Sequence, residues 1–156
     1  MDRLSNGLNS AANGFGTHFY FDKDGTVYQT ASLLKHTNHV GKIKSRCMAG
    51  GTCSAGEAKL IKGRGWNPTK VYNHEKVKAY PERYPTNEDS VGIEVVAMYD
   101  ESTKTWDAPT PEQTESIKVL VRILKKAYSL QDADVYAHDT ISRKTEGEDQ
   151  GLYSGD

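Results

Sequence analysis

Apolar residues recur at two different spacings along the chain, and the clearer of the two is helical. From residue 110 to residue 130 (TPEQTESIKVLVRILKKAYSL), apolar side chains return every three or four positions, which is the period of one helix face. Thr110 is a suitable N-cap, Pro111 suits the first helical position, and Gln113 can complete a capping box. The apolar positions of this predicted amphipathic helix are Ile117, Leu120, Val121, Leu124 and Tyr128. We expect this face to pack on a sheet.

Strand-like runs surround this helix. THFYF (17–21) and GTVYQT (25–30) are separated by DKDG, whose Asp-Gly pair favours a tight turn, so we predict a β-hairpin. SVGIEVVAMY (90–99) is apolar nearly throughout, which is the pattern of a central strand buried on both faces. ADVYAH (133–138) is predicted as a further strand, with His138 at its C-terminal end.

The rest of the chain shows weaker patterns. Residues 2–13 have the apolar spacing of a short helix, and residues 75–80 (EKVKAY) suggest one helical turn. The stretch of about 33–85 is rich in Lys, Gly, Asn and Pro, and we expect an irregular insertion that shapes a groove. Residues 150–156 read as a loose tail. The length of 156 residues fits a single domain over 1–156.

The charge balance limits the possible partners. Twenty basic and twenty-one acidic residues give a formal net charge of −1, so no global attraction draws the chain to nucleic acid or to anionic membranes. No apolar stretch approaches the roughly 20 residues that span a bilayer, so we expect no membrane insertion. The first residues lack a secretory signal pattern. Cys47 and Cys53 can form a disulfide or remain free thiols, and the spacing does not decide between them.

The loop after His138 combines three polar chemistries. Lys144 and Glu146 follow the histidine by six and eight residues. Zinc accepts histidine nitrogen and carboxylate oxygen, and a catalytic zinc normally has three protein ligands. As a candidate zinc site, this loop offers two of them, His138 and Glu146. The alternative is a half-exposed histidine followed by a charged, solvated loop.

Glu94 interrupts the most apolar run of the sequence. Burial of a carboxylate without a partner is costly, so this side chain is expected to face a cation, to accept hydrogen bonds or to line a wet cleft. In a site beside a metal-bound water it can act as a general base. The alternative is a sheet-edge glutamate paired with a lysine. Among the other candidates, we read His39 as a substrate contact, His36 as a surface residue and His18 as a hydrogen-bonded core histidine beneath the hairpin.

Five blocks of sequence together resemble a known enzyme family. GTHFYFDKDGTVYQTASL, HVGK, PTNEDSVGIEVV, TPEQTESIKVLVRIL and DVYAHDTISRKTEG occur in the order and approximate spacing of the zinc-dependent N-acetylmuramoyl-L-alanine amidases of the phage lysozyme and peptidoglycan recognition protein type. The resemblance implies an α/β fold with a central mixed sheet flanked by helices. It also implies a Zn²⁺ ion in a peptidoglycan-binding groove and hydrolysis of the amide between N-acetylmuramic acid and the L-alanine of the stem peptide.

The resemblance assigns roles to the residues that can do chemistry. His138 matches the late zinc histidine, and Glu146 falls on the last ligand, which is usually Asp or Cys. Lys144 falls on a lysine thought to stabilise the oxyanion, and Glu94 on a proposed base. Thr17 stands where several phage members carry a catalytic tyrosine, and its shorter side chain can still donate a hydrogen bond.

The resemblance also assigns the substrate-binding residues. The loop that lines the family's groove falls on His39 to Gly41, and Asn87 belongs to the next matching block, so His39, Gly41 and Asn87 are the predicted peptidoglycan contacts.

One family feature has no counterpart in these blocks. The first zinc histidine of the family lies on an apolar strand ahead of the hairpin, and the chain begins after that point. We therefore expect either a fragment without this strand or a short form with an incomplete metal site, and self-association through an exposed sheet edge. The functional hypotheses are a zinc amidase, a non-catalytic peptidoglycan-binding module, and an antibacterial effector domain delivered to the cell wall or periplasm without a signal peptide of its own.

Overall fold

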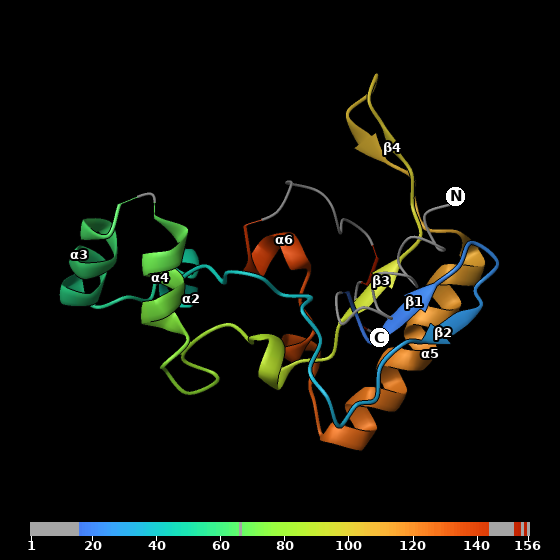
Figure 1. Cartoon of the computed structure of the whole chain (residues 1–156), viewed down its shortest axis with the longest axis horizontal. Helices are drawn as coiled ribbons and strands as arrows, with labels where there is room; N and C mark the ends of the chain where they lie inside the picture. The colour runs from blue at the N-terminus through green and yellow to red at the C-terminus, as the bar shows by residue number, and fades with distance from the viewer. Residues whose placement is uncertain (1–15, 66, 144–151, 154, 156) are drawn as a thin grey trace.

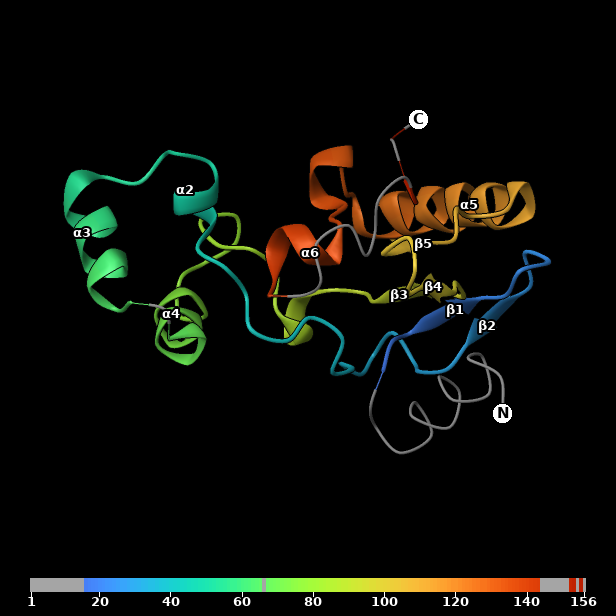
Figure 2. The same cartoon turned by 90° about the horizontal axis from the view of Figure 1, so that it is seen from above.

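The computed structural model describes residues 16–65, 67–143, 152, 153 and 155. The helix predicted over residues 2–13 therefore lies outside the described residues, as do Lys144 and Glu146. The fold is α/β, as predicted. A mixed three-stranded sheet in the order β2-β1-β3 has helix α5 along one face, and helices α2, α3 and α4 lie to one side of this layer (Figure 1, Figure 2).

The predicted hairpin is confirmed. Strands β1 (Phe19–Phe21) and β2 (Val27–Gln29) pair antiparallel, and the turn between them is closed by a hydrogen bond from the Asp22 N–H to the Thr26 carbonyl. Gly25 has φ +82°, and a Cβ atom there would lie 2.8 Å from the Glu112 carbonyl oxygen. Glycine at this turn is therefore required both by the backbone conformation and by the close approach of the α5 N-terminus.

The central strand predicted over 90–99 is wrong in its length and its burial. Strand β3 covers only Ile93–Val95, pairs parallel with β1, and forms an edge of the sheet among the described residues. Its side chains alternate: Ile93 and Val95 pack on the main core, whereas Glu94 on the opposite face is exposed. The apolar run does not mean two-sided burial, because it continues past the strand into loop and the next hairpin.

Helix α5 (Pro111–Tyr128) confirms the helical pattern. Thr110 and Gln113 form the predicted capping box, and the buried face of the helix meets β1. Tyr128 is the exception, because it lies at the last turn and remains 49% exposed. The buried residues of this main core are Phe19, Phe21, Ile117, Val121 and Leu124. Full burial of each such side chain stabilises the fold by roughly 1.5–3 kcal/mol.

Within the stretch of 33–85 that we expected to be irregular, the structure has three helices. The segment contains the helices α2 (Arg46–Ala49), α3 (Ala55–Gly63) and α4 (Pro68–Glu75), which we call the helical lobe. Their apolar stripes are too short to give a clear period, and each helix begins instead at a polar cap. The capping residues are Ser45, Ser54 and Asn67.

Two further predictions concern the helical lobe and the residues that follow it: the state of the cysteines, which the sequence left undecided, and a helical turn. Cys47 and Cys53 form a disulfide, which closes the turn between α2 and α3. The helical turn predicted over 75–80 is also wrong, because α4 ends at Glu75 and the residues that follow form turns.

The strand predicted over residues 133–138 is wrong as well. A short 3₁₀ helix (Asp132–Asp134) is followed by extended backbone, and helix α6 (His138–Ile141) begins at the histidine itself. The extended residues belong to none of the strands in the described part of the sheet. Extended conformation without a pairing partner explains why local pattern alone suggested a strand.

A second, smaller core lies between the helical lobe and α6. Its buried members are Val40, Ile43, Tyr84 and Ile141, and Tyr72 and Tyr136 pack against it. A bridge between Ile43 and Ser142 and a 2.7 Å hydrogen bond from the Lys44 N–H to the Ile141 carbonyl tie the two segments together.

Two remaining segments complete the described structure. Strands β4 (Tyr99–Asp100) and β5 (Thr105–Trp106) form a small hairpin that projects from the body (Figure 1). In the tail expected to be loose, Tyr153 packs on the main core and donates a 3.0 Å hydrogen bond to Asp132. The tail is therefore anchored at this residue.

Candidate functional site

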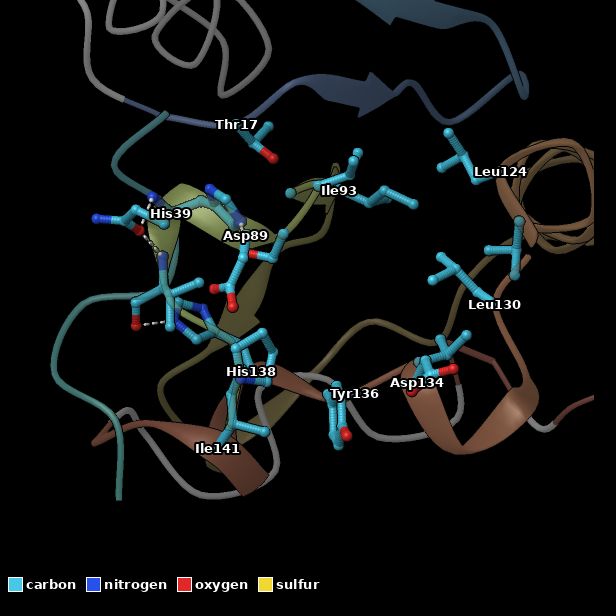
Figure 3. Close-up of a pocket in the computed structure, with 18 of the residues that line it drawn as sticks. Thr17, His39, Asp89, Ile93, Leu124, Leu130, Asp134, Tyr136, His138 and Ile141 are labelled. Atoms are coloured by element: carbon cyan, nitrogen blue, oxygen red, sulfur yellow. Dashed lines mark hydrogen bonds between the residues drawn. The ribbon is translucent and has the colours of Figure 1, made fainter. Parts of the chain in front are cut away.

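A cavity of about 900 Å³ lies where the main core, the second core and the edge of β3 meet. Figure 3 shows its two ends: Thr17, His39, Asp89 and His138 gather at one, and Ile93, Leu124 and Leu130 line the other. Five of the residues predicted from the sequence line this cavity. They are Thr17, His39, Asn87, Glu94 and His138.

His138 is held in a defined orientation at the polar end. It opens helix α6, and its Nε2 lies 2.8 Å from the carbonyl oxygen of Val40. A neutral imidazole that donates from Nε2 carries its lone pair on Nδ1. A backbone carbonyl that accepts from the distal nitrogen is also the usual support of a histidine that binds a metal. The Val40 carbonyl therefore gives the His138 ring the kind of support that a metal-binding histidine usually has.

His39 is part of the wall, and both of its ring nitrogens are engaged. Nδ1 lies 2.9 Å from the Thr37 carbonyl oxygen and Nε2 lies 2.9 Å from the Ser90 hydroxyl. The pKa of His39 is lowered to about 4, mainly by burial and to a lesser extent by the neighbouring His18 and His138, against a raising effect of the Thr37 carbonyl. The ring is therefore neutral at pH 7 and already hydrogen-bonded, which suits a wall residue better than a metal ligand.

Gly92 brings the β3 segment against the polar end. A Cβ atom at this residue would lie 2.4 Å from Thr17 Oγ1 and 2.5 Å from His39 Cγ, so no larger residue fits. The Gly92 N–H also donates a 3.0 Å hydrogen bond to Nδ1 of His18, whose Nε2 donates to the Lys35 carbonyl. His18 is thus the buried, hydrogen-bonded core histidine that was predicted.

Thr17 presents a buried hydroxyl to the cavity. The residue is 1% exposed, and its Oγ1 has no hydrogen-bond partner among the described residues. An unsatisfied buried hydroxyl costs free energy, and a ligand in the cavity can satisfy it. This observation points to a polar ligand at this end.

Glu94 is exposed and lies at the rim of the cavity, which corresponds to the wet-cleft alternative of the sequence analysis. In the parallel register it pairs with Tyr20 of β1. The pKa of Tyr20 is raised by burial and by the neighbouring Glu94 carboxylate. A carboxylate at a wet rim can exchange protons with water, so the position remains compatible with a general base.

Asn87 and Gly41 have different surroundings from those expected of substrate contacts. The Asn87 Oδ1 accepts hydrogen bonds from the N–H groups of His39 (3.1 Å) and Val40 (2.8 Å), so its amide fixes the loop that supports His138. Gly41 is exposed, has φ +74°, and does not line the cavity. Both remain predicted peptidoglycan contacts, and Asn87 also stabilises the loop at His39 and Val40.

Tyr80, Asp134 and Tyr136 are among the cavity residues that sequence reasoning missed, and their side chains form a hydrogen-bonded group. The Tyr80 hydroxyl donates to the Asp134 carboxylate and lies 3.1 Å from the Tyr136 hydroxyl. The available signal was that Tyr136 stands only two residues before His138 in the sequence.

Within the described ranges, one group of three side chains could hold a metal ion, and it lies outside the cavity. The group consists of Glu57, His74 and Glu75 in the helical lobe. Lys78 already bridges the two carboxylates, at 2.6 Å from Glu57 and 2.8 Å from Glu75. Arg64 donates to Nδ1 of His74, so Nε2 carries the proton and donates to Glu57 at 2.7 Å. The group is therefore an ion network without a histidine lone pair for a metal.

The comparisons with known proteins decide the family. The sequence profile described as N-acetylmuramoyl-L-alanine amidase matches residues 2–150. The chain belongs to this family. Neither the curated proteins nor the solved structures gave a match. No helix in the described part of this chain is both long and apolar enough to cross a membrane.

Membership of this family indicates a peptidoglycan amidase-type function. The family acts as peptidoglycan amidases, and its members are typically zinc-dependent. In the described cavity His138 fits the donor set of such a site, whereas Glu146 and Lys144 lie outside the described residues. The arrangement therefore offers one oriented imidazole, one unsatisfied hydroxyl and one rim carboxylate around a space large enough for a substrate.

Proposed function

We propose that this amidase hydrolyses the amide between the lactyl group of N-acetylmuramic acid and the L-alanine of the stem peptide, with Zn²⁺ held by His138 and Glu146. The observation that supports this proposal best is the polar end of the cavity. There the His138 ring is oriented by the Val40 carbonyl, and the Thr17 hydroxyl, which has no hydrogen-bond partner among the described residues, lines the same cavity. A bound zinc would supply Lewis acidity toward the scissile carbonyl.

Four side chains have separate roles in the proposed amide hydrolysis. Glu94 accepts the proton of the attacking water, which reaches it at the exposed rim. The Thr17 hydroxyl donates a hydrogen bond to the substrate, and Lys144 donates to the developing oxyanion. The neutral ring of His39 forms the adjoining wall and keeps a second positive charge away from the metal ligands.

A non-catalytic peptidoglycan-binding module is the second candidate. The observation in its favour is that both ring nitrogens of His39 are already hydrogen-bonded, so this cavity histidine does not supply a third zinc ligand. Two ligands give a much weaker zinc site than three. This function predicts binding to cell-wall sacculi without release of peptide.

The test is release of stem peptides from purified sacculi by the purified chain with added Zn²⁺. Under the amidase proposal, His138→Ala lowers the rate by at least about 100-fold, because a metal ligand is lost. The matched control is His74→Gln, which removes a half-buried, hydrogen-bonded histidine outside the cavity and leaves the rate unchanged. Binding of sacculi without any peptide release, and without zinc at one ion per chain, supports the binding module instead.

Glu94 is tested separately. Glu94→Gln keeps the shape of the side chain and removes its basicity, and we expect kcat to fall about 100-fold or more with KM nearly unchanged. Glu115→Gln, an exposed position on α5, is the control. Equal rates for both variants exclude Glu94 as the base.

The proposed place of action is the bacterial cell wall, because the substrate is found there. Expression of the chain with a periplasmic targeting signal should lyse bacteria, whereas expression in the cytoplasm should not. Lysis that persists in the His138→Ala variant would show that killing does not depend on this site.

A further inference from the structure

Arg46 is the first residue of α2, and its side chain lies in a cage of tyrosines behind the cavity wall. Its guanidinium carbon is 5.7 Å, 5.7 Å and 5.8 Å from the ring centroids of Tyr80, Tyr84 and Tyr136. Each of these distances is within the range of a cation–π interaction. The aromatic rings therefore hold the guanidinium in place from several sides.

The same arginine begins a directed chain of hydrogen bonds. Its Nη1 donates to the Tyr136 hydroxyl at 3.0 Å. Because the Tyr80 hydroxyl donates to Asp134, the 3.1 Å contact between the two tyrosines is made with Tyr136 as donor. This series of hydrogen bonds begins at the Arg46 guanidinium and ends at the Asp134 carboxylate, so the hydroxyls of Tyr136 and Tyr80 are polarised in the same direction.

The segment that carries His138 depends on such side-chain contacts. Residues 135–137 are extended but belong to no strand of the described sheet, so ladder hydrogen bonds do not hold them. Tyr136 lies on the cavity wall next to His138 (Figure 3). The hydroxyl contact with Arg46, together with the packing of the Tyr136 ring on Tyr84, replaces the missing backbone pairing.

Helix α2 presents Arg46 from a fixed position. A helix of four residues is not stable alone, but this one is capped by Ser45 and joined through the Cys47–Cys53 disulfide to the start of α3. The residues just before it are tied to α6 by the bridge between Ile43 and Ser142. These links hold the start of α2, which carries Arg46, next to α6, which carries His138.

We propose that Arg46 is a positioning residue of the amidase site, which fixes Tyr136 and through it the imidazole of His138. This inference rests on the proposed function for its kinetic consequence. Its structural consequence, the orientation of the His138 ring, can be measured whether or not the chain cleaves peptidoglycan.

The kinetic test compares Arg46→Met, Tyr136→Phe and the double variant. Each single change removes one side of the same hydrogen bond, and we expect kcat to fall about tenfold with KM within about twofold, because the reacting groups are misplaced rather than lost. The double variant should be no slower than the worse single variant, since the two residues act as one unit. Arg46→Lys, which keeps a donor and a charge, should recover part of the rate.

The independent readout is the NMR signal of the His138 ring in metal-free protein at fixed pH. Arg46→Met should shift the His138 ring resonances and leave those of buried His18 unchanged. Arg122→Met, at an exposed position on α5, is the control and should shift neither. If Arg46→Met lowers only the melting temperature, with kcat and the His138 resonances as in the parent protein, the role is structural and the inference is wrong. If the parent protein shows no amidase activity, the proposed function fails, and the ring resonances still decide the role of Arg46.

Discussion

The sheet with α5 and the helical lobe are stabilised in different ways. The first region has five buried apolar residues in one core, including Phe21, which is fully buried. The lobe contributes only Ile61 and Val71 to the buried apolar residues that the structure describes there. It relies on helix caps, a disulfide and the ion network around Glu75. Apolar periodicity reveals the first kind of region, whereas the second kind is encoded in polar residues at single positions.

The cavity is lined directly by the first region, whereas the helical lobe reaches it only through the second core, because no described residue of α2, α3 or α4 lines it. Its apolar end belongs to the main core, and its polar end is supported by the second core and by the loop that Asn87 fixes. A change in either region is therefore expected to reach the site, but by a different physical route. The following four changes test this comparison.

The largest effect is expected from Phe21→Ala in the main core. Removal of this fully buried ring should destabilise the protein by about 3–5 kcal/mol, since transfer and cavity costs add. Val119→Ala on α5, where the side chain is 43% exposed, is the control and should cost less than about 1 kcal/mol. Urea denaturation measures both. Similar costs for the two variants would contradict the assignment of the core.

The lobe should respond most strongly to loss of a charge. Lys78→Met leaves the fully buried carboxylate of Glu75 without its cation, which should cost about 3 kcal/mol or more. Lys104→Met breaks an exposed pair with Glu101 and should cost at most about 1 kcal/mol. Equal denaturation midpoints for the two variants would show that the network does not stabilise the lobe.

Acid should weaken the fold through His39. Its folded-state pKa of about 4 lies below the ordinary value of 6.5, so the folded state favours the neutral ring. The stabilising contribution is fully present above pH 6.5 and is lost as the pH falls toward 4, by about 3 kcal/mol in total. His39→Gln should flatten the dependence of unfolding free energy on pH in this window. If His39→Gln leaves the pH dependence of the unfolding free energy unchanged, groups other than His39 cause the loss of stability in acid.

The smallest of these effects is expected from the disulfide. Cys47 and Cys53 are separated by 6 positions, and closing so short a loop stabilises by only about 2 kcal/mol. Reduction, or replacement of both cysteines by serine, should lower the melting temperature by several degrees. If Arg46 positions His138, reduction should also lower kcat, because α2 loses its link to α3. A melting temperature that is independent of reductant would contradict the stabilising role.

The sequence allowed the prediction of the elements in which one local period dominates. The hairpin and α5 were found because an Asp-Gly turn and a capped apolar stripe are complete within a few residues. The three helices of the lobe were missed because their signal is the polar cap rather than a stripe. Ser54 with Glu57 three residues later, and Asn67 before Pro68, were readable signals of this kind.

The candidate site was partly predictable for a similar reason. His138, Glu94 and Thr17 stand in sequence blocks that resemble the family, and the structure brings all three to one cavity. Tyr80 and Arg46 were missed because neither lies in such a block, and their relation to the site exists only after folding.

By itself, the sequence determined the family, the α/β class, the hairpin and the main amphipathic helix, since each depends on patterns within short segments. Only the tertiary structure decided that Val40 supports His138 across 98 positions and that Arg46 reaches Tyr136 across 90. It also decided that Cys47 and Cys53 are joined. Contacts of this range depend on how the two cores pack together, and no local period along the chain records that packing.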